Sequence, residues 1–397
     1  MRRMPPWRND FLNWAIILWI VLGTARVALD VRRFGFLALR DYAMVYYAAF
    51  FFLAQRYAAD ARARRFLIAC LSGAAVVLLP VYILYQVFPA FFFANLSVRG
   101  VPLIFFKDDL AATFVAVGAV LVFHRAEGRH RLWAWPLATL MFLAVLSGYN
   151  RASIAGAVAA AVWLALGRRW KFPALQAAAA ATALLIAITL TASGRFPDLE
   201  SRVEGWFERA ASVVDISGSR VYGSVHAEDK GDNNLFRRFW WETIIDDTMA
   251  KGPILGLGFG YDIAESFVRK YRPVDEEFYA RSPHSIIFSA FGRMGFVGLL
   301  SLTAVVAAFA AATWRALRDS RTELAAAGLW PAAWAIFVSA CFGVVLEGPM
   351  GAVVFWSLLG LANGWPNRSS GESCALSQTL NTIDMDAPLP AHVSELS

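Results

Sequence analysis

The sequence predicts an all-α, polytopic bundle of about ten transmembrane helices, with ten to twelve as the range, carrying one large polar loop domain. Hydrophobic residues make up 58% of the chain and charged residues only 17%, whereas about a quarter of the residues in soluble domains are charged. The apolar residues form continuous stretches close to the roughly 20 residues that a helix needs to cross a bilayer. Since unpaired backbone groups are costly in lipid, these stretches are expected to be helices.

The expected spans form two groups, within residues 1–193 and 284–366, on either side of the polar stretch. Their approximate bounds are 10–29, 36–54, 66–87, 108–124, 132–148, 152–167, 174–193, 294–314, 329–346 and 350–366. The segment 88–107 is interrupted by two prolines and a glycine, which predicts an interfacial or re-entrant piece instead of a span. Residues 367–397 are rich in Ser, Asp, Pro and Thr, which predicts a disordered cytoplasmic tail.

Charge is sorted by region. The polar stretch 194–283 holds 16 Asp and Glu against 12 Lys and Arg, although the chain has a net charge of +7. Four short connections contain clusters of basic residues, within 56–65, 125–131, 168–171 and 315–321. With ten spans and a cytoplasmic N-terminus, all four clusters lie on the cytoplasmic side, as the positive-inside rule requires.

This orientation places the large loop, residues 194–283, outside the cytoplasm and both termini in the cytoplasm. The first connection, with Arg26, Arg32, Arg33 and Arg40, fits the orientation less well. Because membrane orientation accounts for the basic residues, the sequence gives no reason to expect nucleic-acid binding.

Within the loop, residues 233–251 predict one amphipathic helix. Asp232 or Asn233 can cap its start, and Gly252-Pro253 ends it. Its apolar stripe is expected to lie on the membrane surface or on the bundle, and it comprises Leu235, Phe236, Phe239, Trp240 and Ile244. The glycine run 256–260 that follows has two readings, a phosphate-binding loop or a turn. We favour the turn, because the run lacks the Gly-Lys-Ser/Thr ending of a phosphate-binding loop.

His284 lies where the polar loop meets an apolar helix. Histidine is the usual proton-transfer group near neutral pH, so His284 is a candidate general base. The alternative is a histidine at a helix start that the headgroup region satisfies.

Three arginines are candidate anion-binding residues. Arg151 opens an apolar segment, Arg237 lies in the amphipathic helix, and Arg281 precedes His284 by three residues. A guanidinium group binds phosphate oxygens through paired hydrogen bonds, although an arginine at a membrane surface can also extend to the headgroups. Arg238, by contrast, has Glu242 four residues later and is expected to form an exposed ion pair.

Three segments, in this order, resemble the O-antigen ligase and polymerase family of bacterial membrane glycosyltransferases. They are Ser147-Gly148-Tyr149-Asn150-Arg151, then Arg237-x-x-x-Trp241 with Gly252-Pro253-Ile254-Leu255-Gly256-Leu257-Gly258, and then Pro283-His284-Ser285 with Gly295 and Gly298. The resemblance covers about residues 130–315. The chain departs from the family pattern at Asn150, where Ser is common, and at Ser285, where Asn is expected.

The resemblance implies transfer of a glycan from an undecaprenyl-diphosphate carrier in membrane lipid, with inversion and without a metal or other cofactor. The acceptor would be lipid A core for a ligase or a second lipid-linked glycan for a polymerase. By the same resemblance Arg151 and Arg237 would bind the diphosphate, and His284 would be the general base. Arg281 is a further candidate for substrate binding.

Two other classes of function stay open. A transporter or flippase for lipid-linked glycans would perform no covalent chemistry, and it would place ionisable residues near the membrane midplane. Arg40, Asp41 and Arg293 are the few charged residues inside or beside the expected spans. The third class is a structural membrane partner that uses the loop for docking.

Overall fold

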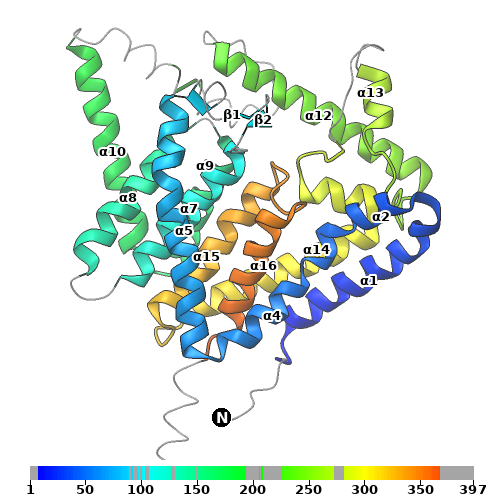
Figure 1. Ribbon diagram of the computed structural model, residues 1–397, viewed down its shortest axis with the longest axis horizontal. Helices are drawn as coiled ribbons and strands as arrows, with labels where there is room; N and C mark the ends of the chain where they lie inside the picture. Colours follow the sequence, from blue (N-terminus) through cyan, green and yellow to red (C-terminus); the bar gives the residue numbers. More distant parts are fainter. Residues whose placement is uncertain are drawn as a thin grey trace, which may run out of the picture.

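The protein is a bundle of helices in the computed structural model (Figure 1), which describes residues 8–88, 91–92, 97–98, 101–102, 107–126, 130–148, 150–193, 205, 207–208, 225–271 and 281–366. The helices are α1 (Phe11–Phe34), α2 (Phe36–Asp41), α3 (Ala43–Tyr46), α4 (Ala49–Ala58), α5 (Ala61–Val87), α7 (Asp108–Arg125), α8 (Arg131–Ser147), α9 (Arg151–Leu166), α10 (Lys171–Ala192), α12 (Val225–Lys251), α13 (Glu265–Tyr271), α14 (Ile286–Arg318), α15 (Leu324–Ala340) and α16 (Pro349–Gly364). Two strands, β1 (Ser97–Val98) and β2 (Val101–Pro102), pair antiparallel within the segment 88–107. The predicted all-helical class is confirmed, and the predicted tail 367–397 lies outside the described residues.

Each predicted span coincides with a helix or, for 36–54, with the three short helices α2, α3 and α4. Among the described residues, five segments are long and apolar enough to cross a membrane: Phe11–Phe34, Phe36–Ala58, Ala61–Val87, Lys171–Ala192 and Ile286–Arg318. The apolar helices α8, α9, α15 and α16 have only 16 or 17 residues, at the lower limit of about 17 for a spanning helix. The structure therefore supports fewer long spans than the ten predicted.

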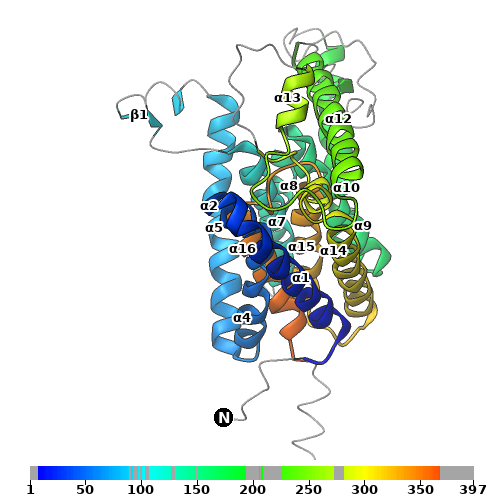
Figure 2. The same ribbon diagram turned by 90° about the vertical axis from the view of Figure 1, so that its right-hand side faces the viewer.

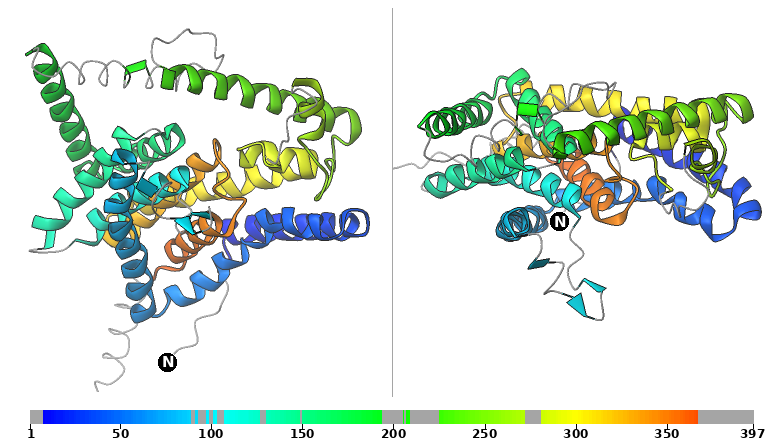
Figure 3. Two further views of the ribbon diagram at one scale, coloured as in Figure 1. Left: turned by 45° about the horizontal axis from the view of Figure 1, so that its top comes forward. Right: turned by 90° about the horizontal axis from the view of Figure 1, so that it is seen from above.

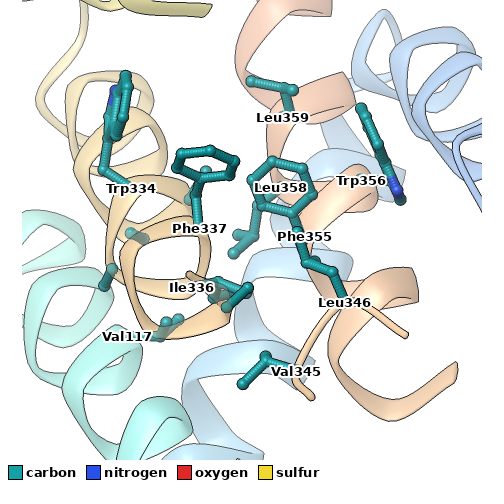
Figure 4. Close-up of a cluster of buried hydrophobic side chains, with 14 of the residues drawn as sticks. Val117, Trp334, Ile336, Phe337, Val345, Leu346, Phe355, Trp356, Leu358 and Leu359 are labelled. Atoms are coloured by element: carbon teal, nitrogen blue, oxygen red, sulfur yellow. The ribbon is translucent and has the colours of Figure 1, made fainter. Parts of the chain in front are cut away.

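The core is formed by the central helices, and it contains aromatic side chains from α14, α15 and α16. Phe309 of α14 stacks on Trp334 of α15, with ring centroids 4.2 Å apart. Figure 4 shows Phe337 of α15 beside Phe355 of α16, and their ring centroids are 6.3 Å apart. By contrast, α10 contacts mainly α8 and α9 and leaves most of its length exposed at the edge of the bundle (Figure 1). Lipid is the expected neighbour of such an apolar surface.

The polar elements gather at one end of the bundle. Figure 2 shows α12 and α13 at the end opposite to the start of α1, and Figure 3 shows α12 running across that end. Helix α12 begins at Val225, ahead of the predicted start near 233, and ends at Lys251 immediately before Gly252-Pro253, as predicted. Trp240 and Ile244 of its apolar stripe are buried, and the helix packs on α13 and α14.

Helix α14 is broken at Gly295, which has φ 59° and ψ −149°. The break leaves backbone groups without helical partners, and the segment after α12 supplies them. Leu257 and Gly258 donate to the carbonyls of Gly292 and Arg293 (2.8 and 3.1 Å), while Phe296 N donates to the carbonyl of Pro253 (2.8 Å). A buried helix interruption is tolerated when such bonds satisfy its backbone, so the glycine run locks the loop to α14.

Replacing Gly295 with alanine is expected to disrupt this connection. A Cβ at Gly295 would lie 2.4 Å from Pro253 O and 2.6 Å from Gly256 N, both backbone atoms. Gly35 is a matched control, since it has a similar conformation (φ 57°, ψ −134°) but no heavy atom within 4 Å of an added Cβ. Both alanine variants share the backbone strain, and Gly295→Ala should add about 1–3 kcal/mol of overpacking.

The measurement is thermal unfolding of the two purified variants in detergent. Gly295→Ala should melt clearly below Gly35→Ala. Equal melting temperatures would contradict the close backbone packing between the glycine run and the α14 break.

Candidate functional site

His284 lies two residues before the start of α14 in a strained backbone conformation. Its φ of 57° is uncommon for a residue other than glycine, and such strain often marks functional positions. Within the described part of the chain, its Nδ1 is buried and has no hydrogen-bond partner. The imidazole therefore keeps hydrogen-bonding capacity that the surrounding protein does not use.

Helix α12 is bonded directly to the His284 loop. Trp241 Nε1 donates to the carbonyl of Pro283 (2.7 Å), and the Trp241 ring stacks on Phe288 of α14. Trp240 meets the His284 ring edge-on, with centroids 6.1 Å apart. Arg237 is one helical turn before Trp241, so the same helix that holds the loop also carries this arginine.

The electrostatic surroundings favour a neutral His284. Burial lowers the pKa of its imidazole, and the positive charges of Arg237 and then Lys107 lower the pKa further. The Asp109 carboxylate and the interaction of the imidazole with the Ser282 backbone act in the opposite direction. A neutral imidazole is the form that can accept a proton.

Arg237 is half-buried. Burial lowers the pKa of its guanidinium group, and Asp109 raises it. The group stays charged, because the ordinary pKa of an arginine lies far above neutral pH. A partly desolvated cation beside His284 is suited to holding an anionic substrate group.

Arg151 is the first residue of α9, and α12 also contacts its side chain. Asn150 caps the helix by accepting from Ser153 N (2.9 Å). Arg151 Nη2 donates to Asn234 Oδ1 on α12 (2.9 Å). Asn234 precedes Arg237 by three residues, a spacing that puts both on one face of the helix. Through α12, Arg151 is therefore held at the same end of the bundle as Arg237 and His284.

Arg281 faces a different set of partners. Its guanidinium donates to the carbonyl of Gly260 (2.9 Å) and pairs with Asp262 (3.5 Å) and Asp41 (3.8 Å). These contacts tie Arg281 to the glycine run and to α2. Arg238 forms the predicted exposed ion pair with Glu242 (2.8 Å), which confirms that expectation.

The turn interpretation of the glycine run 256–260 is also confirmed. Phe259 N donates to Asp30 Oδ2 (2.7 Å) and Gly260 N to Asp41 Oδ2 (3.0 Å), while the preceding N–H groups bond to α14. The N–H groups of residues 257–260 are therefore engaged within the protein, and a phosphate-binding loop would need them to point at its ligand.

The structure adds three residues to the site that the sequence did not single out. Lys107 and Asp109, 3.6 Å apart, begin α7 and act on His284 electrostatically. Glu347, between α15 and α16, accepts from Ser289 Oγ (2.6 Å) and from the Ser282 side chain. Burial raises the pKa of its carboxyl group. In the sequence, the signal that could have identified all three is a charged residue next to an otherwise apolar helix.

The comparisons with known proteins agree with this geometry. Residues 136–303 match the protein family described as O-antigen ligase, and this range includes Arg151, Arg237, Arg281 and His284. No curated protein matches the chain. Residues 136–303 are thus similar to an O-antigen ligase domain, and the chain is a multi-pass membrane protein.

Proposed function

We propose that this O-antigen ligase domain transfers a glycan from an undecaprenyl-diphosphate carrier to an acceptor hydroxyl at the periplasmic face of the inner membrane. The observation that supports the proposal is that Arg151 and the loop before His284 are both hydrogen-bonded to α12, the helix that carries Arg237. Arg237 lowers the pKa of His284, and Arg151 is hydrogen-bonded to α12 one turn from Arg237.

In the proposed reaction, His284 accepts the proton of the acceptor hydroxyl as its oxygen attacks the anomeric carbon of the donor sugar. The bond between that carbon and the phosphate oxygen breaks, and its electron pair stays on the leaving lipid diphosphate. Arg151 and Arg237 neutralise the charge that develops there, which is the largest form of stabilisation in many enzymes. Attack from the face opposite to the leaving group inverts the anomeric configuration. The proposal assigns no role to a metal.

The orientation belongs to the proposal as well. The basic clusters of the short connections favour a cytoplasmic N-terminus. The start of α1 lies at the end of the bundle opposite to α12 and α13 (Figure 2). A cytoplasmic N-terminus therefore supports placing α12 and His284 on the periplasmic side, where a lipid-linked donor presents its glycan.

The pH dependence of the reaction follows from His284. The neutral base is the active form, so the rate should fall as the pH drops through the folded-state pKa. Because that pKa is lowered, the acidic limb of kcat/KM should lie below the ordinary histidine value of about 6.5. Lys107→Met removes one positive charge that lowers the pKa and should move the limb to higher pH. A wild-type limb at or above 6.5 that Lys107→Met leaves unchanged would contradict the assignment of His284.

The polymer that accumulates in a deletion strain tests the proposed function and separates its two forms. Loss of a ligase should leave complete polymer on its lipid carrier, with lipid A core as the unused acceptor. Loss of a polymerase should leave single repeat units. A strain in which lipid-linked glycan instead accumulates on the cytoplasmic side would indicate transport without covalent chemistry and would overturn the proposal.

A further inference from the structure

Asp41, at the end of α2, is a buried carboxylate on which several parts of the fold converge. Its side chain is 6% exposed. One oxygen, Oδ2, lies 2.7 Å from Arg293 Nη1 and 3.8 Å from Arg281 Nη2, and it accepts from Gly260 N at 3.0 Å. The other oxygen, Oδ1, pairs with Arg40 (3.2 Å). Burying a charge is costly without such partners, so Asp41 favours one arrangement of these groups.

The two arginines around Asp41 continue into the loop that ends at His284. Arg293 Nη2 donates to the carbonyl of Arg281 (3.5 Å), and Arg293 Nη1 donates to the carbonyl of Tyr261 (3.5 Å). Arg281 donates in turn to the carbonyl of Gly260. Both the backbone and the side chain of Arg281 are therefore fixed three residues before His284.

A strained backbone persists only where its surroundings determine it. The positive φ of His284 has two fixed points in the residues that precede it. Trp241 holds the carbonyl of Pro283, and the Asp41 network holds Arg281. Without Asp41, Arg281 and the buried Arg293 lose their shared partner, and the loop before His284 loses one of these fixed points.

A second carboxylate from the N-terminal helices acts in parallel. Asp30 of α1 is 5% exposed, accepts from Phe259 N (2.7 Å) and pairs with Arg26 (3.3 Å). Arg26 also donates to the carbonyl of Gly256 (3.2 Å). Residues 30 and 41 both lie outside the matched family region 136–303. Helices α1 and α2 therefore supply the acids that hold the glycine run.

We propose that Asp41 is a positioning residue for glycan transfer, which fixes the Arg281–His284 segment through Arg281 and Arg293. The first two helices thereby complete a site that the O-antigen ligase domain forms only in part. Arg281 is assigned to this network instead of to the lipid diphosphate. The inference rests on the proposed function, because its readout is the transfer reaction.

The test compares Asp41→Asn with wild type in steady-state transfer from a purified undecaprenyl-diphosphate glycan. A displacement of about 1 Å at a catalytic group can cost about 100-fold in rate. We expect kcat to fall about 10- to 100-fold, with little change in KM for the donor. A displaced His284 would also be less buried and farther from Arg237 and Lys107, the three largest influences, all of which lower its pKa. Its acidic limb should therefore move up toward the ordinary histidine value, although the smaller, raising effect of Asp109 would also weaken.

Asp10→Asn is the control for a general loss of stability. Asp10 caps α1 and accepts from Asn363 Nδ2 (2.9 Å), so it anchors the N-terminal helices far from the loop in sequence. It should leave kcat and the acidic limb unchanged. If Asp41→Asn does not fold, the Arg281→Gln variant replaces it in the test. A lower kcat with an unchanged KM for the donor would support the positioning role. A raised KM for the donor with an unchanged kcat would overturn that role.

The two levels of the proposal fail differently. Wild-type protein without transfer activity would overturn the proposed function. An active wild type with an equally active Asp41→Asn variant would overturn only the positioning role. The positioning role would also be overturned if Asp10→Asn lost as much kcat as Asp41→Asn and neither variant moved the acidic limb of the pH profile.

Discussion

Replacing His284 with alanine is expected to lower kcat for glycan transfer by about 100- to 10,000-fold, the usual contribution of a positioned general base. The acceptor hydroxyl would then have to lose its proton to water. Donor binding should change little, because the diphosphate is held by the arginines. The measurement is the initial rate of transfer at saturating donor and acceptor. Thermal unfolding should show that the variant is folded, since Nδ1 of the His284 ring has no partner among the described residues.

His130→Ala is the matched control. His130 precedes α8, is exposed and makes no side-chain capping bond. It should retain wild-type kcat. A His284→Ala variant that keeps more than about a tenth of the wild-type rate would leave no room for general-base catalysis of ordinary size.

Arg237→Ala is expected to have the second largest effect, a loss of about 100- to 1,000-fold in kcat/KM for the lipid-linked donor. This is the range seen when an enzyme loses one hydrogen-bond donor that stabilises a developing negative charge. Arg237 is half-buried and lies close enough to His284 to lower its pKa, so its charge acts where the diphosphate would lie. Arg237→Lys should recover only part of the activity, because a lysine lacks the planar pair of donors.

The neighbouring residue provides the control for Arg237. Arg238 is exposed and pairs with Glu242, so Arg238→Ala removes the same charge from the same helix without reaching the site. Its activity should stay within a small factor of wild type. Equal losses of activity in Arg237→Ala and Arg238→Ala would show that the net charge of α12 matters. They would contradict specific binding of the diphosphate by Arg237.

The helical segments were predictable from hydropathy because each transmembrane helix satisfies its own backbone within one continuous apolar run. The end of α12 at Gly252-Pro253 and the Arg238–Glu242 pair were predictable for a similar reason, since both depend on neighbours in sequence. Ten spans were predicted, and five described segments are long and apolar enough to cross a membrane, with four shorter apolar helices beside them. Apolarity alone does not determine whether a helix of 16 or 17 residues crosses the membrane.

The break in α14 could not be predicted from Gly295, because a glycine inside an apolar segment is often tolerated in a regular helix. What makes the break stable is the segment 253–258, which is distant in sequence and supplies the missing hydrogen bonds. Similarly, Asp41 and Arg281 are 240 positions apart, and their contact arises only from the packing of α2 against the glycine run. Long-range pairings of this kind leave no local pattern.

The candidate site shows the same division. Arg151, Arg237 and His284 were chosen from the sequence by residue type, by position at the ends of apolar segments and by family resemblance. The structure links Arg151 and His284 to α12 by hydrogen bonds at Asn234 and Trp241. Lys107 and Asp109 were missed, because an ion pair at a helix start is usually a solvated feature without function.

The most direct test of the central claim is the amount of undecaprenyl diphosphate released per glycan transferred by the purified protein. If Arg151, Arg237 and His284 act on one lipid-linked donor, wild type should release one carrier for each new glycosidic bond. His284→Ala should release almost none while still binding the donor. No release by wild type, or wild-type release by His284→Ala, would contradict the account.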